Sequence, residues 1–463
     1  MSQTATEPCG ASDQTAPRRP QPITSAPDFE ASAVAGLPQW WRAGQQEAWS
    51  RFATLPMPKR KDESWRFADV TKISLDGYQA GLPLSDAARK EAKDRLLAHA
   101  AKSKALAALA YANDERVFFR ALPEELTARG VLFLPLSEAL KHHAALVEKH
   151  FMTHPTTLGG AKFEALHRAW CGQHLGGAFL YVPKGVELPA PVEVFHWIGE
   201  NNAAIFPHIL VVAEAHSRVE VVVRYGSLSQ AQGGFCASSV DLHAGPGAKV
   251  RHIASQDFEE SVLSFQTGST AVERDGSALS FALNLGGAYS RVENKSRMLG
   301  AGSRSDMLSL TAATGTQIFD QRTYQEHVAD HTTSDLLYKN ALSDTARTIF
   351  AGMISVDPGA QQTDAYQSNP NLLLSDTAEA NSLPGLEIQA NDVRCTHGST
   401  GGPIRGEEMF YMAQRGIPVA VARRLFVLGF FDEVLERLGD EALSEELHEL
   451  IVAKYDRAWP QSK

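Results

Sequence analysis

The stretch SALSFALNLG, residues 277–286, decides the fold. Every second residue is large and apolar (Leu279, Phe281, Leu283, Leu285), and the residues between them are small or polar. A β-strand places successive side chains on opposite faces, so this pattern predicts a strand with one buried face.

The same alternation recurs along the chain, for example in RVEVVVRYG at residues 218–226. Apolar strand centres follow one another at intervals of roughly 30 residues, which is typical of stacked structural repeats. These centres are Val221, Val250, Phe281, Leu308 and Leu337. No long helical pattern interrupts the strands, which argues against βαβ units. The spacing predicts a β-solenoid, and it leaves a sandwich or barrel open as the alternative.

The two ends of the chain have a different character. Residues 1–35 are rich in Ser, Thr, Ala, Pro and Gln, and we expect them to form a disordered tail. Residues 36–175 are expected to be a helical region, including an Ala-rich helical stretch at 86–110. The β-helix core is expected over 176–405.

Helical spacing returns over residues 406–463. Pro418 is expected in the first turn of a helix that runs to about Leu438 and carries apolar residues on two sides. Such a helix must be buried or must meet a partner. We expect a further helix over 441–455.

Composition excludes several classes of function. The net charge of −10 is unfavourable for binding nucleic acid or an anionic membrane surface. No run of about 18 apolar residues is present, so no membrane span is expected. The N-terminus lacks a secretory signal, and a G-x-x-x-x-G-K-[ST] phosphate-binding loop is absent, so ATP hydrolysis is not expected.

The four cysteines are Cys9, Cys171, Cys236 and Cys395, and none is part of a C-x-x-C pair. This pattern indicates neither a disulfide framework nor a zinc ribbon. Scattered thiols are typical of a reducing compartment, and a cytoplasmic location is therefore expected.

The densest chemistry lies in NDVRCTHGSTG, residues 391–401. Cys395 and His397 are two residues apart, so in a strand they would share a face and could offer a thiolate and an imidazole to one soft metal ion. A closed site needs about four ligands, so another chain or a substrate would have to supply the rest. The alternative is a polar turn in which Cys395 is simply packed. His327 and His331, with Asp330, form a second polar cluster for which a metal role is weaker.

Several short motifs resemble the SufB/SufD family of iron–sulfur cluster assembly proteins. They are LPMPKRKDESWR at 55–66, LYVPKGV at 180–186 followed by Pro191, DVRCTHGST at 392–400, and EEMFYMAQRGI at 407–417. Together they extend from about residue 50 to residue 438. The resemblance implies a right-handed parallel β-helix between helical ends, in agreement with the strand pattern.

Two departures resemble the SufD branch of this family rather than the SufB branch. Asn369 stands where SufB has a cysteine, ahead of the apolar run 372–374, and Gly398 stands where SufB has a glutamate. The resemblance therefore implies a non-catalytic scaffold subunit that has no permanently bound cofactor. His397, with Cys395 as the secondary candidate, would bind a transient iron–sulfur cluster shared with SufB.

The resemblance also implies two partners. SufB would associate through the β-helix, and the ATPase SufC would bind the helices near Pro418–Leu438. An interaction module without a metal role is the alternative. A β-helix enzyme acting on polysaccharide is a more distant one, because such enzymes are commonly secreted.

Overall fold

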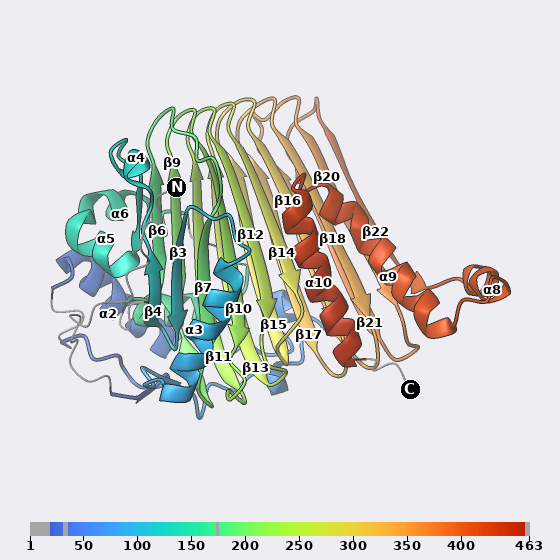
Figure 1. Cartoon of the computed structure of the whole chain (residues 1–463). Helices are drawn as coiled ribbons and strands as arrows, with labels where there is room; N and C mark the ends of the chain where they lie inside the picture. The colour runs from blue at the N-terminus through green and yellow to red at the C-terminus, as the bar shows by residue number, and fades with distance from the viewer. Residues whose placement is uncertain (1–18, 31–35, 155, 157, 173–175, 459–463) are drawn as a thin grey trace, which may run out of the picture.

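The computed structural model describes residues 19–30, 36–154, 156, 158–172 and 176–458. Two facing β-sheets, with helices at both ends of the chain, form most of this part (Figure 1). From β10 onward, successive strands alternate between the sheets, and each strand pairs in parallel with the strand one turn further along. This topology confirms the predicted β-solenoid and excludes a sandwich or a barrel.

The strands of the first sheet, in spatial order, are β4 (Glu115–Arg120), β3 (Ala107–Ala112), β7 (Val192–Ile198), β10 (Arg218–Ser227), β12 (Lys249–Asp257), β14 (Ser277–Asn284), β16 (Arg304–Ala313), β18 (Thr333–Leu342), β20 (Asp364–Leu373) and β22 (Arg394–Pro403). The second sheet contains β1 (Gln21–Pro22), β2 (Gln79–Ala80), β8 (Ala203–Ile205), β11 (Gly234–Ala244), β13 (Val262–Val272), β15 (Tyr289–Met298), β17 (Ile318–His327), β19 (Arg347–Val356) and β21 (Glu379–Ile388), together with β5 (Leu132–Pro135), β6 (Ala178–Val182) and β9 (His208–Ala213).

The register of the first sheet explains the apolar repeat. Phe281, Leu308 and Leu337 stack directly above one another, and the same column continues back through Ile253 and Val222. The expected centre Val221 pairs with His252, one position before this column, and Val250 lies three positions before Ile253. The turns differ in length by a few residues, so a constant spacing identifies the strands but misplaces the register in the early turns.

A column of tight turns lies along one edge of the solenoid. In each turn, one residue with φ between 56° and 73° lies two positions before a strand of the first sheet. Gly, Asp and His tolerate this left-handed conformation better than most residues do. The turns also pair with each other: the N–H of Asp275 donates to the carbonyl of Ala301, and the N–H of His331 donates to that of Gln361. The six residues are His216, Gly247, Asp275, Gly302, His331 and Gln362.

Helices from the N-terminal region cover the outer face of the second sheet. α2 (Gln39–Thr54) packs against α7 (Ala161–Trp170), and the ring of Phe163 in α7 stacks on Phe265 with centroids 3.7 Å apart. The remaining elements of this region are the 3₁₀ helices η1 (Glu63–Trp65) and η2 (Val70–Lys72) and the α-helices α3 (Asp86–Ala100), α4 (Glu124–Thr127), α5 (Leu136–His142) and α6 (Ala144–His150).

Two expectations for the N-terminal part need correction. The helical region also contains the strands β2 to β5, and the expected helix at 86–110 ends as α3 at Ala100, before β3 begins at Ala107. Within the expected disordered tail, residues 1–18 and 31–35 lie outside the described residues. Residues 19–30 are described, and there β1 pairs with β2 while the side chain of Ile23 is fully buried.

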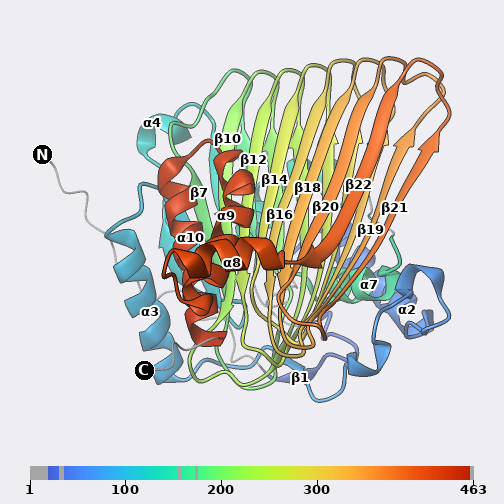
Figure 2. The same ribbon diagram turned by 90° about the vertical axis from the view of Figure 1, so that its right-hand side faces the viewer.

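The C-terminal helices α8 (Gly406–Gln414), α9 (Val419–Glu436) and α10 (Glu441–Ala458) follow β22. α9 and α10 lie across the outer face of the first sheet, whereas α8 projects away from it (Figures 1 and 2). Phe431 of α9 and Ile451 of α10 belong to the same apolar cluster as the column through Phe281. The side of α9 that faces the sheet is therefore part of the core of the protein. No described helix is long and apolar enough to cross a bilayer.

Candidate metal centre

The last strand of the first sheet carries both predicted ligands. In β22, Cys395 pairs in register with Ala365 of β20, and His397 pairs with Gln367. Ala365 and Gln367 are 1% and 0% exposed, so this face of the sheet points into the solenoid. His397 is nevertheless exposed and Cys395 half-buried, because no described strand stacks on β22.

The last strand of the second sheet shows the same arrangement. Leu386 and Ile388 of β21 pair with Ile354 and Val356, which are fully buried. Leu386 and Ile388 are 37% and 40% exposed. The final turn thus presents an uncovered interior with an apolar side on β21 and a thiol–imidazole side on β22.

The thiol of Cys395 is not activated by its surroundings. Partial burial, together with the negative charge of Asp364, raises the pKa of this thiol above its ordinary value. It packs beside an apolar cluster that includes Ile354 and Ala390. Cys395 is therefore a neutral thiol in the free chain, and it would bind a metal ion only by losing its proton.

Asn369 is buried and hydrogen-bonded. Its amide nitrogen donates to the carbonyl of Tyr338 at 3.0 Å, and its side-chain oxygen accepts from Ser382 at 2.9 Å and from Asn371 at 3.1 Å. The turn below β22 thus contributes a fixed polar network here rather than a thiolate.

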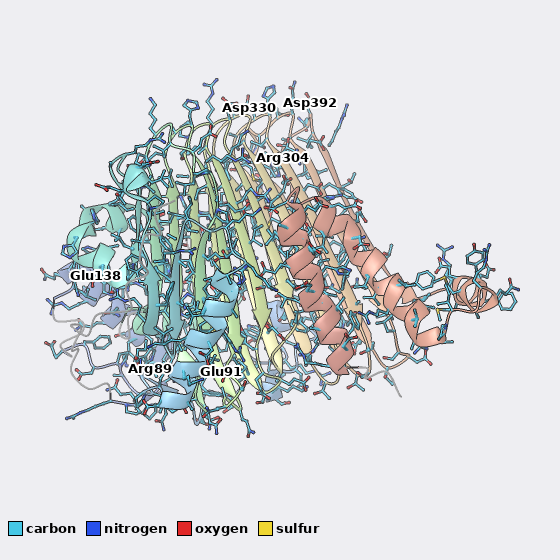
Figure 3. All side chains as sticks on the ribbon, viewed as in Figure 1. Arg89, Glu91, Glu138, Arg304, Asp330 and Asp392 are labelled. Atoms are coloured by element: carbon cyan, nitrogen blue, oxygen red, sulfur yellow. The ribbon has the colours of Figure 1, made fainter. Side chains whose placement is uncertain are left out.

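The polar cluster around His327 does not form a site. His327 points into the solenoid, where its two ring nitrogens contact the hydroxyls of Thr332 and Ser334 at 2.7 and 2.8 Å. His331 lies in an exposed turn, with its ring 3.0 Å from the carboxylate of Asp330, at the edge of the solenoid visible in Figure 3. His327 and His331 are close in sequence, but His327 points into the solenoid and His331 lies in the exposed turn, so the two imidazoles do not face a common site.

Sequence reasoning missed a buried cluster at the other end of the solenoid. His167, Cys171 and His208 place three metal-binding atoms within 4.8 Å of one another. Among the described residues, this is the place where three His, Cys, Asp or Glu side chains converge so closely, and the pair Cys395–His397 has no such third member. The spacing of four between His167 and Cys171 was a detectable signal, because such residues share a helix face. The contribution of His208 had no counterpart in the sequence pattern.

Comparison with known proteins agrees with this architecture. A family model described as the SufBD core domain of the SUF system for FeS cluster assembly matches residues 196–430, and a model of the SufBD protein N-terminal region matches residues 34–194. The chain therefore belongs to the SufBD family of iron–sulfur cluster assembly proteins.

Among individual relatives, the chain is 29% identical to the iron–sulfur cluster assembly protein SufD of Bacillus subtilis, over 90% of this chain and 94% of that protein. It is 32% identical to SufD of Escherichia coli over 54% of this chain and 58% of that protein. A SufBD family protein of Synechocystis is 27% identical over 88% of this chain and 89% of its own length. The chain is thus a SufD-like member of the family, and this assignment offers no support for the polysaccharide-acting alternative.

Proposed function

We propose that this chain is a non-catalytic scaffold subunit of a SufBCD-type complex in the cytoplasm, and that its last solenoid turn is one half of the site where an iron–sulfur cluster is built. The observation that carries the proposal is the open end. Cys395 and His397 face the interior of the solenoid. Each earlier turn is covered by the turn that follows it, whereas no described turn covers the one that carries these two residues. A SufB-type partner would cover this end.

The chemistry of the pair fits a shared and transient cluster. A neutral imidazole such as that of His397 binds iron through a nitrogen lone pair and need not release a proton. The thiol of Cys395 must release its proton before it can bind. Two ligands from this chain are too few to hold a cluster by themselves, so the partner would have to supply the others. A cluster held across an interface can be released when the two subunits rearrange. Such binding is appropriate for a cluster that is passed on to another protein rather than for a permanently bound cofactor.

The ATPase of the complex would bind at the projecting C-terminal segment. Phe410 and Tyr411 of α8 are 64% and 55% exposed, and Val419 and Leu425 of α9 are 53% and 48% exposed. Large exposed apolar side chains on the projecting helix α8 and on the first turns of α9 are typical of a docking surface. A partner that binds here can move α9 relative to the sheet, and ATP turnover in that partner would thereby be coupled to the scaffold.

The test is His397→Ala in the assembled complex, with His142→Ala as the matched control. His142 is also an exposed histidine, with 67% of its side chain accessible, but it lies in α5 at the opposite end of the solenoid. We expect His397→Ala to lower iron and sulfide per complex several-fold, with a change in stability below about 0.5 kcal/mol, as for other surface substitutions. Cys395→Ser should have the smaller effect of the two site variants.

The outcome also separates the proposal from an interaction module without a metal role. If His397→Ala assembles and melts normally and yields as much cluster as His142→Ala, the ligand role is wrong. Unchanged cluster with weakened assembly would favour the module.

A further inference from the structure

The buried cluster of His167, Cys171 and His208 is formed where α7 meets the first turns of the solenoid. α7 carries His167 near its C-terminal end, and Cys171 directly follows the helix. His208 is the first residue of β9. The three residues are 1%, 0% and 0% exposed, respectively. Two imidazoles and a thiol are thus buried close together, far along the chain from β22.

The polar contacts around the cluster favour one tautomer for each histidine. Nδ1 of His167 lies 2.9 Å from the carbonyl oxygen of Ala237, which can only accept, so the proton is on Nδ1. Nε2 of His208 makes no hydrogen bond of good geometry, but it lies 3.3 Å from Oδ2 of Asp241, and a carboxylate at this distance favours a proton on Nε2. Asp241 is itself held by the backbone N–H of Met152 at 2.7 Å.

These assignments leave two lone pairs facing each other. Nε2 of His167 and Nδ1 of His208 are 3.2 Å apart, and in the tautomers favoured above neither nitrogen carries a proton. Two acceptor nitrogens at this distance repel each other unless a cation lies between them. The sulfur of Cys171 lies within 4.8 Å of a ring nitrogen of each histidine.

We propose that His167, Cys171 and His208 bind a divalent metal ion of the zinc class. With zinc–nitrogen bonds of about 2.0–2.1 Å, tetrahedral geometry places two ligand nitrogens about 3.3 Å apart. The observed 3.2 Å matches this separation. A set of two imidazoles and one thiolate selects Zn²⁺, Co²⁺ or Fe²⁺ over Mg²⁺ and Ca²⁺, which prefer oxygen. Three protein ligands leave a fourth position for water or an exogenous ligand.

The outer contacts of the two histidines resemble those found around metal-binding histidines. Metal-binding histidines characteristically donate their second N–H to a backbone carbonyl or a carboxylate. His167 has the carbonyl of Ala237, and His208 has the carboxylate of Asp241. Both acceptors belong to β11, so the ion would join α7 to two neighbouring strands. It would act as a structural clip between the N-terminal helices and the start of the solenoid, separate from the cluster-building end.

The experiment uses the full-length chain, stripped of metal with a chelator and then titrated with Co²⁺ and with Zn²⁺. We expect about one Co²⁺ per chain, with a sulfur-to-cobalt charge-transfer band in the near ultraviolet and d–d bands of a tetrahedral site in the visible. Zn²⁺ should displace Co²⁺ and raise the melting temperature, because an ion that binds only the folded state stabilises it.

Two cysteine variants are the matched pair. Cys171→Ser should lose the charge-transfer band and at least about tenfold in affinity, and it should lose the thermal gain from Zn²⁺. Cys236→Ser changes another fully buried cysteine that lies outside the cluster, and it should retain all three signals. His167→Gln serves as a second variant if Cys171→Ser does not fold.

Three results would overturn the proposal. They are a wild-type chain that binds no Co²⁺, a charge-transfer band that persists in Cys171→Ser and His167→Gln, and a band that is instead lost in Cys395→Ser. The last result would place the metal ion at the open end of the solenoid. None of the three depends on whether the chain builds iron–sulfur clusters.

Discussion

At the scale of single residues, Arg291 is the clearest link between the N-terminal region and the solenoid. Its guanidinium carbon lies 3.8 Å from the ring centroid of Trp65, and its Nη2 donates to the carbonyl of Ser64 at 3.0 Å. It also forms ion pairs with Asp320 and Glu293, and all three charged side chains are at most 1% exposed. The segment around Trp65, one of the motifs that resembled the SufB/SufD family, therefore packs over a buried charge network.

Arg291→Met tests this network. Removing the cation leaves the buried carboxylate of Glu293 without its cationic partner, while Asp320 keeps only its ion pair with Arg322. Breaking a buried ion pair in this way costs about 3–5 kcal/mol. Urea denaturation should show the lower stability. Arg304→Met is the control, because Arg304 pairs with Asp306 at the surface and is 51% exposed (Figure 3), so its loss should cost no more than about 1 kcal/mol. Equal effects of the two substitutions would mean that the buried network contributes little.

The candidate ligands were only partly predictable at this scale. The spacing of two between Cys395 and His397 is enough to place them on one face of a strand, because side chains alternate along it. Which face points inward depends on Gln367, one turn below, and on the register that joins the two strands. His208 joins His167 and Cys171 only through the pairing of β9 with β11, which no local pattern encodes.

At the scale of elements, the sequence pattern failed where tertiary pairing overrode local propensity. The segment 107–112 reads AALAYA, and its Ala and Leu residues favour a helix. In the structure it is β3, which is buried over its whole length between β4 and β7. Ala110 and Ala112 of β3 belong to the same buried cluster as Ala88 and Ala92 of α3, so the stability of this strand depends on neighbours that are distant in sequence.

The apolar pattern of α9 was recognised, but its two sides have different roles. Val427 and Phe431 are fully buried and belong to the cluster over the first sheet, whereas Leu425 is half exposed. A truncation after Gly416 would remove α9 and α10 together and uncover the sheet. Such a truncation is therefore a poor test of ATPase docking, and substitutions in α8 are the better choice.

The double variant Phe410→Ala/Tyr411→Ala should abolish co-purification with the SufC-type ATPase and leave the melting temperature within about 1 °C, since no side chain of α8 is buried. Phe431→Ala is the contrasting variant: it removes a fully buried ring and should cost about 3–5 kcal/mol. ATPase binding retained by the α8 double variant would place the docking surface elsewhere.

At the scale of the whole molecule, the solenoid could be predicted because each stacked turn repeats the same pattern of apolar residues at a nearly constant spacing. Each turn repeats the same two strands, so several weak local signals reinforce one another. The two ends do not repeat, and the pattern cannot show what covers them. The structure shows that helices and short strands cover the first turns, whereas the interior face of the last turn is exposed among the described residues.

The open end leads to a prediction about assembly. Ile388 is 40% exposed although Val356, its partner one turn below, is fully buried. If a SufB-type subunit covers this end, Ile388 lies in the interior of the interface, where an unpaired charge is costly. Ile388→Asp should therefore weaken association with that subunit at least about tenfold, equivalent to ~1.4 kcal/mol. The melting temperature of the isolated chain should change little.

Leu97→Asp is the matched control. Leu97, like Ile388, is an exposed aliphatic residue, with 66% of its surface accessible, but it lies on α3 at the other end of the molecule. Titration calorimetry or analytical ultracentrifugation with the purified partner gives both affinities. If Ile388→Asp and Leu97→Asp bind the partner equally well, the last turn is not the interface. In that case His397 and Cys395 would lack the second subunit on which a shared cluster depends, so the assembly measurement bears directly on the proposed site.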